Sequence, residues 1–166
     1  MPEDAPRFLR PGAVERLFTQ AFGVLVGWGL GLSHNYLVEV RGRRTGRVYA
    51  TPVDLLELRE RRFLVAGRGA TQWVRNAEAA GELALRKGWR RRTFTVTAIP
   101  NDQKPEILKA YLDRFRLTVQ RYFPVPAGSP PSAFVDVAGR YPVFELREPP
   151  PATPGGRPAP PTGARA

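Results

Sequence analysis

The chain has 166 residues, of which 26 are lysine or arginine and 15 are aspartate or glutamate, so its formal net charge is +11. This length and an apolar content of 42% are those of one globular domain, and the charge calls for an anionic partner such as nucleic acid, anionic lipid or an acidic cofactor. The absence of cysteine excludes disulfides, thiolate metal sites and cysteine nucleophiles, and the single histidine, His34, argues against a histidine metal cluster or a serine–histidine triad.

The N-terminal part divides into two segments. Residues 1–12 are mixed and contain proline, which predicts a flexible N-terminus without a secretory signal and favours a cytoplasmic protein. Apolar residues recur at helical spacing from Ala13, and Ala21 to Leu32 is apolar on all sides, although it is shorter than the roughly 20 residues that span a bilayer. We expect a helix over residues 13–32 that packs on the rest of the domain or on a second subunit in a homodimer. A peripheral contact with the membrane surface is the alternative.

Alternating apolar residues predict strands at six places in the rest of the chain. Pro52 lies inside the second predicted strand, Arg47–Leu58. Because proline lacks the N–H that a strand ladder needs, this strand should bulge or lie at an edge there. The predicted strands are Tyr36–Arg41, Arg47–Leu58, Phe63–Ala66, Leu83–Arg86, Arg92–Ile99 and Tyr141–Arg147.

Two predicted helices separate these strands. The first covers Thr71–Ala80 and is stopped by Gly81. The second is long, with Asp102 as its expected cap and Pro105 in its first turn. It carries a core stripe with a spacing of four residues, formed by Ile107, Tyr111, Phe115 and Val119.

Short turns between neighbouring strands indicate a mainly antiparallel sheet, which favours a small barrel over a doubly wound sheet. The sequence therefore predicts an α+β fold, a small and mainly antiparallel β-barrel of five to six strands with flanking helices. It divides the chain into flexible residues 1–12, a single domain over 13–148 and a tail over 149–166. That tail holds seven prolines and almost nothing to bury, so we expect it to be disordered.

The turn between the first two predicted strands is rich in arginine and glycine, with the sequence Gly42-Arg43-Arg44-Thr45-Gly46-Arg47. Its glycines can adopt positive φ, so the backbone can turn tightly and direct N–H groups outward. The three arginines add planar, bidentate donors at the same place. Such a loop suits a multiply charged anion, for example a phosphate with trailing carboxylates, although a basic turn taken alone also fits a solvated surface loop.

The segments after this turn carry a resemblance that runs from Leu37 to Leu146. The turn is followed by a strand with Thr51-Pro52, by a strand ending in Val65-Ala66-Gly67-Arg68-Gly69, and by a helix with Gln72-Trp73-Val74-Arg75-Asn76. In this order they resemble the deazaflavin-dependent nitroreductases and quinone reductases, a family of split β-barrel oxidoreductases that use coenzyme F420.

The resemblance implies a set of residues that bind the coenzyme. The arginine turn would bind the phosphate and glutamyl tail, the second strand would line the ring pocket, and the glycine-rich segment, with the amides near Thr71, would donate backbone N–H groups. Trp73 would pack beside the coenzyme and Asn76 would anchor the helix. The candidates for a hydroxyl that donates a proton or hydrogen bond to the acceptor are Tyr111 and Tyr122, and Tyr122 is preferred because Tyr111 lies in the core stripe. If the resemblance is set aside, the simplest interpretation is structural: Thr51 and Pro52 are ordinary strand residues, Trp73 is a core aromatic residue, and Asn76 is an amide on the helix surface. The implied binding residues are Arg43, Arg44, Thr45, Gly46, Arg47, Thr51, Pro52, Ala66, Gly67, Arg68, Gly69, Trp73 and Asn76.

The sequence lacks a P-loop, a Gly-x-Gly-x-x-Gly fingerprint, a Gly-x-Ser-x-Gly elbow and a His-Glu-x-x-His pair. Such a chain is expected to take its reactivity from a cofactor. The leading hypothesis is an oxidoreductase that uses reduced F420 to transfer hydride to a quinone, a nitroaromatic or an activated alkene, with no metal site. The alternatives are an FMN-binding split-barrel flavoprotein and a non-catalytic nucleic-acid-binding barrel. The last is disfavoured because the arginines cluster at turns and no RNA-recognition signature is present.

Overall fold

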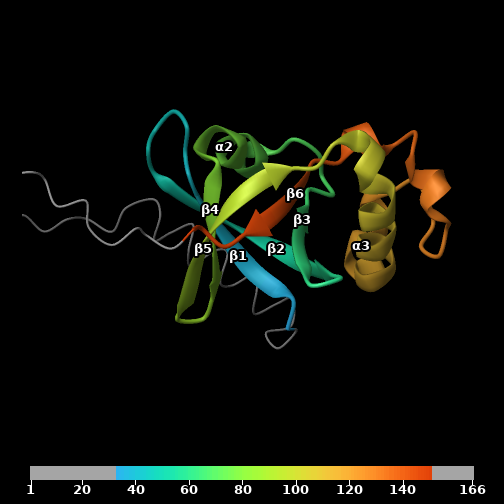
Figure 1. Ribbon diagram of the computed structural model, residues 1–166, viewed down its shortest axis with the longest axis horizontal. Helices are drawn as coiled ribbons and strands as arrows, with labels where there is room; N and C mark the ends of the chain where they lie inside the picture. The colour runs from blue at the N-terminus through green and yellow to red at the C-terminus, as the bar shows by residue number, and fades with distance from the viewer. Residues whose placement is uncertain (1–32, 151–166) are drawn as a thin grey trace, which may run out of the picture.

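The computed structural model describes residues 33–150 (Figure 1). The predictions for residues 1–12 and 13–32, and for the tail beyond residue 150, lie outside these residues. No helix within 33–150 is long and apolar enough to cross a membrane.

Six strands close into a barrel in which every neighbouring pair is antiparallel, in the order β1-β2-β3-β6-β5-β4. The predicted fold class is therefore confirmed. Short connections join β1 to β2, β2 to β3 and β4 to β5, which is why these strands pair as neighbours. The strands are β1 Asn35–Arg41, β2 Val48–Leu58, β3 Arg61–Val65, β4 Glu82–Lys87, β5 Arg90–Ala98 and β6 Val143–Arg147.

Two α-helices flank the barrel on different sides (Figure 1): α2, Gln72–Ala80, packs on β1 and β4, and α3, Lys104–Val119, packs on β2 and β3. Gly81 ends α2 in the left-handed conformation, as predicted. The predicted cap of the second helix is wrong. Asp102 lies in a 3-10 turn, Asn101–Gln103, that precedes α3, so the chain is already coiled before the α-helix begins. Further 3-10 turns cover Gln120–Tyr122, Pro131–Phe134 and Ala138–Arg140.

The core consists of two clusters. All six strands contribute to the first, which therefore fills the barrel and joins it to α2 through Trp73, Val74 and Ala77. The second lies between the barrel and α3 and includes the whole predicted stripe, so that prediction is confirmed.

The two parts of strand β2 pair with different neighbours: residues 48–54 pair with β1, and residues 55–58 pair with β3. Pro52 lies opposite Leu37 of β1, whereas pairing with β3 begins at Leu55. Residues 48–54 thus form an edge, as expected from the proline. The same arm of β2 forms one wall of the site described below.

A buried carboxylate on β6 supports a prediction about acid stability. Glu145 accepts hydrogen bonds from Arg61 Nε at 2.8 Å, Arg61 Nη2 at 2.9 Å and Arg147 Nη2 at 2.9 Å. The bond from Arg61, helped by Arg147, lowers the pKa of Glu145 from 4.5 to about 2. Because the folded pKa lies below the unfolded one, the stabilisation is complete above about pH 4.5 and is lost as the pH falls toward 2.

We therefore expect Glu145→Gln to lower the free energy of unfolding at neutral pH by about 2 kcal/mol, the value of hydrogen bonds to a charged group. In urea titrations, the gap between the two proteins should close as the pH is lowered from 4.5 to about 2. Glu57→Gln is the matched control, because Glu57 is largely exposed and 3.6 Å from Arg62. A gap that is independent of pH would contradict the assignment.

Candidate functional site

The turn between β1 and β2 is closed by its own backbone. Gly42 N–H donates to Arg47 O at 2.7 Å, and Gly46 N–H donates to Gly42 O at 2.8 Å. Gly46 has φ +68°, which favours glycine. At Gly42 the constraint is space, since a Cβ atom would lie 2.5 Å from the ring of Tyr49 and 2.9 Å from Thr45 Oγ1. The two glycines predicted to shape this turn are therefore required for different reasons.

The turn is held against α2 by one asparagine. Asn76 is buried, and its Oδ1 accepts hydrogen bonds from Arg43 N–H at 3.3 Å and from Arg43 Nη1 at 2.9 Å. Arg43 Nη1 also donates to Gln72 Oε1 at 3.0 Å. Both the backbone and the side chain of Arg43 are thus positioned by the same face of the helix.

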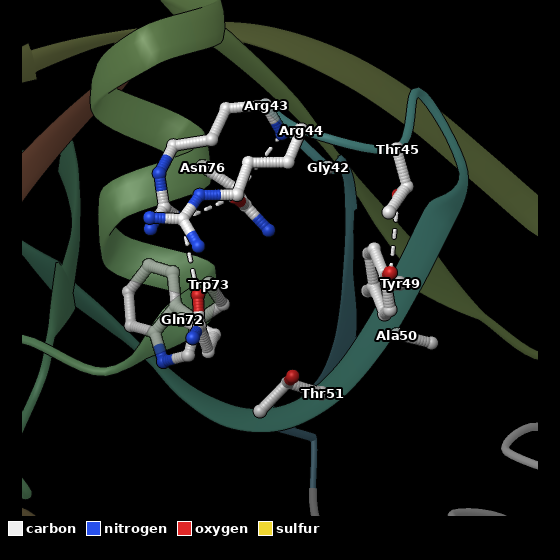
Figure 2. A pocket seen from close by; sticks show the side chains of 10 residues that line it. All are labelled: Gly42, Arg43, Arg44, Thr45, Tyr49, Ala50, Thr51, Gln72, Trp73 and Asn76. Atoms are coloured by element: carbon white, nitrogen blue, oxygen red, sulfur yellow. Dashed lines mark hydrogen bonds between the residues drawn. The ribbon is translucent and has the colours of Figure 1, made fainter.

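A pocket of about 440 Å³ opens between this turn, the edge arm of β2 and the start of α2. In Figure 2 the two arginines and the α2 residues stand on one side of it, Thr45 and Tyr49 on the other, and Thr51 at its lower end. Trp73 is itself positioned by an edge contact with Phe144, with ring centroids 5.9 Å apart. The lining residues are Gly42, Arg43, Arg44, Thr45, Tyr49, Ala50, Thr51, Gln72, Trp73 and Asn76.

The pocket is basic and one of its charges is unpaired. Arg43 donates to neutral amide oxygens, which do not cancel its charge, and Arg44 forms no hydrogen bond or ion pair with any residue in 33–150. No carboxylate lines the pocket. Two guanidinium groups beside an indole ring can bind a ligand that combines a flat ring with a negatively charged part.

The start of α2 adds polar groups without intrahelical partners. Arg75 N–H makes the first bond of the helix, to Thr71 O at 3.2 Å, so the amides of residues 72–74 have no partner within it. Thr71 precedes the helix but does not cap it, and its Oγ1 is a buried side-chain atom that lacks a hydrogen-bond partner within the described part of the chain. These groups adjoin Gln72 and Trp73 of the pocket.

The structure brings six of the predicted binding residues together in this pocket. Three others of that set, Gly46, Arg47 and Pro52, lie next to them in sequence but do not line it. Sequence reasoning missed four lining residues, although spacing could have found two: Tyr49 precedes Thr51 by two along a strand, and Gln72 precedes Asn76 by four along a helix. The six are Arg43, Arg44, Thr45, Thr51, Trp73 and Asn76.

The glycine-rich segment 66–69 and Tyr122 form a second group. Ala66 N–H donates to Pro142 O at 2.9 Å. A Cβ atom on Gly67 would lie 3.7 Å from the Tyr122 ring, and the Arg68 guanidinium carbon lies 5.9 Å from the centre of that ring. These predicted residues are near one another, but they are not among the residues that line the pocket.

The link between Asn76 and Arg43 leads to a prediction about both stability and the turn. Asn76→Ala should lower the free energy of unfolding by about 1–2 kcal/mol, because it removes the acceptor for two donors. It should also raise amide hydrogen exchange in residues 43–46. Asn76→Asp keeps an acceptor oxygen and should restore slow exchange. Unchanged exchange in Asn76→Ala would show that this link does not order the turn.

The fold and the site together define a small antiparallel barrel with a basic, aromatic-walled pocket. The family model for F420H(2)-dependent quinone reductase matches residues 14–122, more than half of the chain, and the chain belongs to this family. Membership confirms the predicted family and coenzyme F420.

Solved structures are similar to this chain at low sequence identity. The protein Atu2129 (unknown function) from Agrobacterium tumefaciens str. C58 is 18% identical, with a TM-score of 0.51 over 87% of this chain and 59% of that one. This chain thus spans 59% of the length of the Agrobacterium protein. An F420-H2 dependent reductase (FDR-A) is 15% identical, with a TM-score of 0.47 over 72% of this chain and 100% of that one. None of the curated proteins matches the sequence.

Proposed function

We propose that this chain is a reductase that transfers hydride from reduced F420 to a quinone, a nitroaromatic or an activated alkene. The observation that supports this most strongly is the pocket in which Arg43 and Arg44 stand against Trp73. Family membership supports the class of reaction, and the acceptor is part of the proposal.

The residues of the pocket fit the coenzyme by their chemistry. Its flat ring needs an apolar or aromatic wall, which Trp73 and Ala50 offer, and its phosphate and glutamyl carboxylates need cations, which Arg43 and Arg44 offer. A volume of about 440 Å³ is in the usual range for small-molecule sites. The unpaired donors at the start of α2 suit the same anionic ligand.

When bound, reduced F420 supplies the hydride. In the proposal, the chain's own residues bind the anionic tail through Arg43 and Arg44 and hold the ring against Trp73, which also keeps water away from one side of it. Tyr122 is proposed to act on the acceptor side, where its hydroxyl would donate a proton. Its own backbone carbonyl accepts a hydrogen bond from Tyr141 OH at 2.7 Å, which helps to fix its position.

Titration of the full chain with F420 and with FMN, followed by fluorescence quenching, tests the binding part. We expect saturation with F420 at micromolar concentration and much weaker binding of FMN. Mixing the protein and reduced F420 with menadione should then give the visible absorbance change of coenzyme oxidation. No binding of F420 at micromolar concentration would count decisively against the proposal.

Tyr122→Phe tests the acceptor-side part separately. We expect kcat to fall by about 100-fold, the scale of general acid catalysis, without a change in coenzyme affinity. The bond from Tyr141 goes to the backbone, so the substitution leaves it in place. An unchanged kcat would remove Tyr122 from the proposal and leave the coenzyme site intact.

The cytoplasmic location, the homodimer and the membrane contact through residues 13–32 stay predictions. Residues 13–32 lie outside the described residues. Size-exclusion chromatography with light scattering of the full chain would test the homodimer.

A further inference from the structure

A tryptophan stands in solvent at the tip of the β4–β5 hairpin. Trp89 is 97% exposed, and Gly88 beside it turns the chain with φ +57°. In Figure 1 this hairpin projects from the barrel on the side away from α3. A tryptophan in this position contributes no core packing, so its large apolar ring is available to another surface.

The tryptophan lies within a run of cations. Residues 86–92 contain Arg86, Lys87, Arg90, Arg91 and Arg92 and no acidic residue. Among residues 33–150, two carboxylates bind this run: Glu39 accepts bonds from Arg86 at 3.3 Å and Arg91 at 2.7 Å, and Glu148 binds Arg92. Within the described part of the chain, five cations of the hairpin face two carboxylates, which leaves an excess of positive charge there.

One cation is directly available beside the ring. The side chain of Arg90 is exposed and forms no hydrogen bond or ion pair with another residue of the described range 33–150. Trp89 and Arg90 are therefore adjacent residues that present an aromatic ring and a guanidinium group to solvent.

The hairpin also contacts Ser33, the first residue that the structure describes. Lys87 Nζ donates to Ser33 O at 2.6 Å, and Ser33 directly follows the apolar run Ala21 to Leu32 in the sequence. The exposed tryptophan and the excess positive charge thus belong to the same hairpin.

We propose that the β4–β5 hairpin docks on an anionic lipid bilayer, with Trp89 at the boundary between headgroups and acyl chains. Tryptophan is enriched at that boundary, and arginine pairs with lipid phosphates while being more weakly hydrated than lysine. Nucleic acid is usually held in a basic groove with several stacking aromatic residues. A single tryptophan at a hairpin tip suits a membrane interface better, and this docking does not depend on the proposed reaction.

Co-sedimentation of the full chain with vesicles tests the proposal. Wild-type protein should bind vesicles of phosphatidylcholine mixed with phosphatidylglycerol and not phosphatidylcholine alone, and binding should weaken with salt. Trp89→Ser should lower the partition coefficient about tenfold, through the lost apolar area. Arg90→Gln should lower it about fivefold, the equivalent of about 1 kcal/mol per cation near the surface.

The matched control is Leu117→Ser. Leu117 on α3 is 95% exposed and lies next to Arg116, so it offers a similar apolar and basic pair on a different face. We expect this change to leave vesicle binding as in the wild type. All three substitutions are at exposed side chains and should preserve F420 affinity, which verifies folding.

Quenching by brominated lipid locates the tryptophan. In a Trp28→Phe background, Trp89 fluorescence should be quenched by brominated phosphatidylglycerol vesicles, whereas the buried Trp73 should not be. Vesicle binding that survives Trp89→Ser combined with Arg90→Gln would overturn the proposal, as would the absence of binding to anionic vesicles. A gel shift with single-stranded DNA that both substitutions abolish, without vesicle binding, would reassign the hairpin to nucleic acid.

Discussion

Replacing Arg44 by glutamine is expected to weaken the binding of F420 at least tenfold. Arg44 lines the pocket and has no partner among residues 33–150, so its charge is available to the anionic part of the coenzyme. A hydrogen bond to a charged group contributes about 1.5–3 kcal/mol, which corresponds to roughly 10- to 100-fold in affinity. Fluorescence quenching at low and high salt measures the effect, and the salt dependence of binding should also decrease.

Arg47→Gln is the matched control, because Arg47 belongs to the same turn but does not line the pocket. We expect at most a twofold change in affinity, the size of a screened surface charge. Equal losses in both variants would mean that the turn acts only through its total charge. No loss in either would refute the arginine turn as the binding site for the coenzyme tail.

Phe144→Ala is expected to lower the free energy of unfolding by about 3–5 kcal/mol. Phe144 is 1% exposed inside the barrel, so truncation leaves a cavity that the surrounding strands can fill only in part. Its ring also contacts Trp73, which lines the pocket. The variant should therefore lose coenzyme affinity as well as stability, as measured by urea unfolding and by F420 titration at a temperature where it is folded.

Phe134→Ala separates the two effects. Phe134 is 0% exposed but belongs to the cluster on the α3 side, so we expect a similar loss of stability with unchanged coenzyme affinity. Phe144→Leu should cost less than about 1.5 kcal/mol, because most of the volume is kept. If Phe144→Ala and Phe134→Ala had the same affinity for F420, the contact between Phe144 and Trp73 would have no role in the site.

Much of the barrel could be predicted because local signals and tertiary structure agree. The alternation of apolar residues and the short turns identified all six strands, and Gly81 ended α2 where the sequence indicated. The helix cap at Asp102 could not be predicted in the same way. The 3-10 turn that contains Asp102 contacts the 3-10 turn at Ala138–Arg140, which is distant in sequence, and local residue preferences do not reveal such a contact.

The candidate site could be predicted only in part for a similar reason. The charge of Arg43 and Arg44 is visible in the sequence, but the hydrogen bonds that place Arg43 against Asn76 join residues 33 apart. Tertiary structure also determines which predicted residues line the pocket and which lie in the group around Tyr122. The second group forms because Tyr122 packs beside Gly67, which is 55 residues earlier in the sequence.

The arm of β2 over residues 48–54, which pairs with β1 but not with β3, has a consequence for solubility. An open strand edge is a template on which a second chain can add a strand, and such addition is a common start of aggregation. Here Pro52 interrupts the row of donors along the arm, and the arginine turn at its end places repelling charges on any two copies that approach. The barrel can therefore keep one strand edge open for a ligand while disfavouring the addition of a strand from a second copy of this chain.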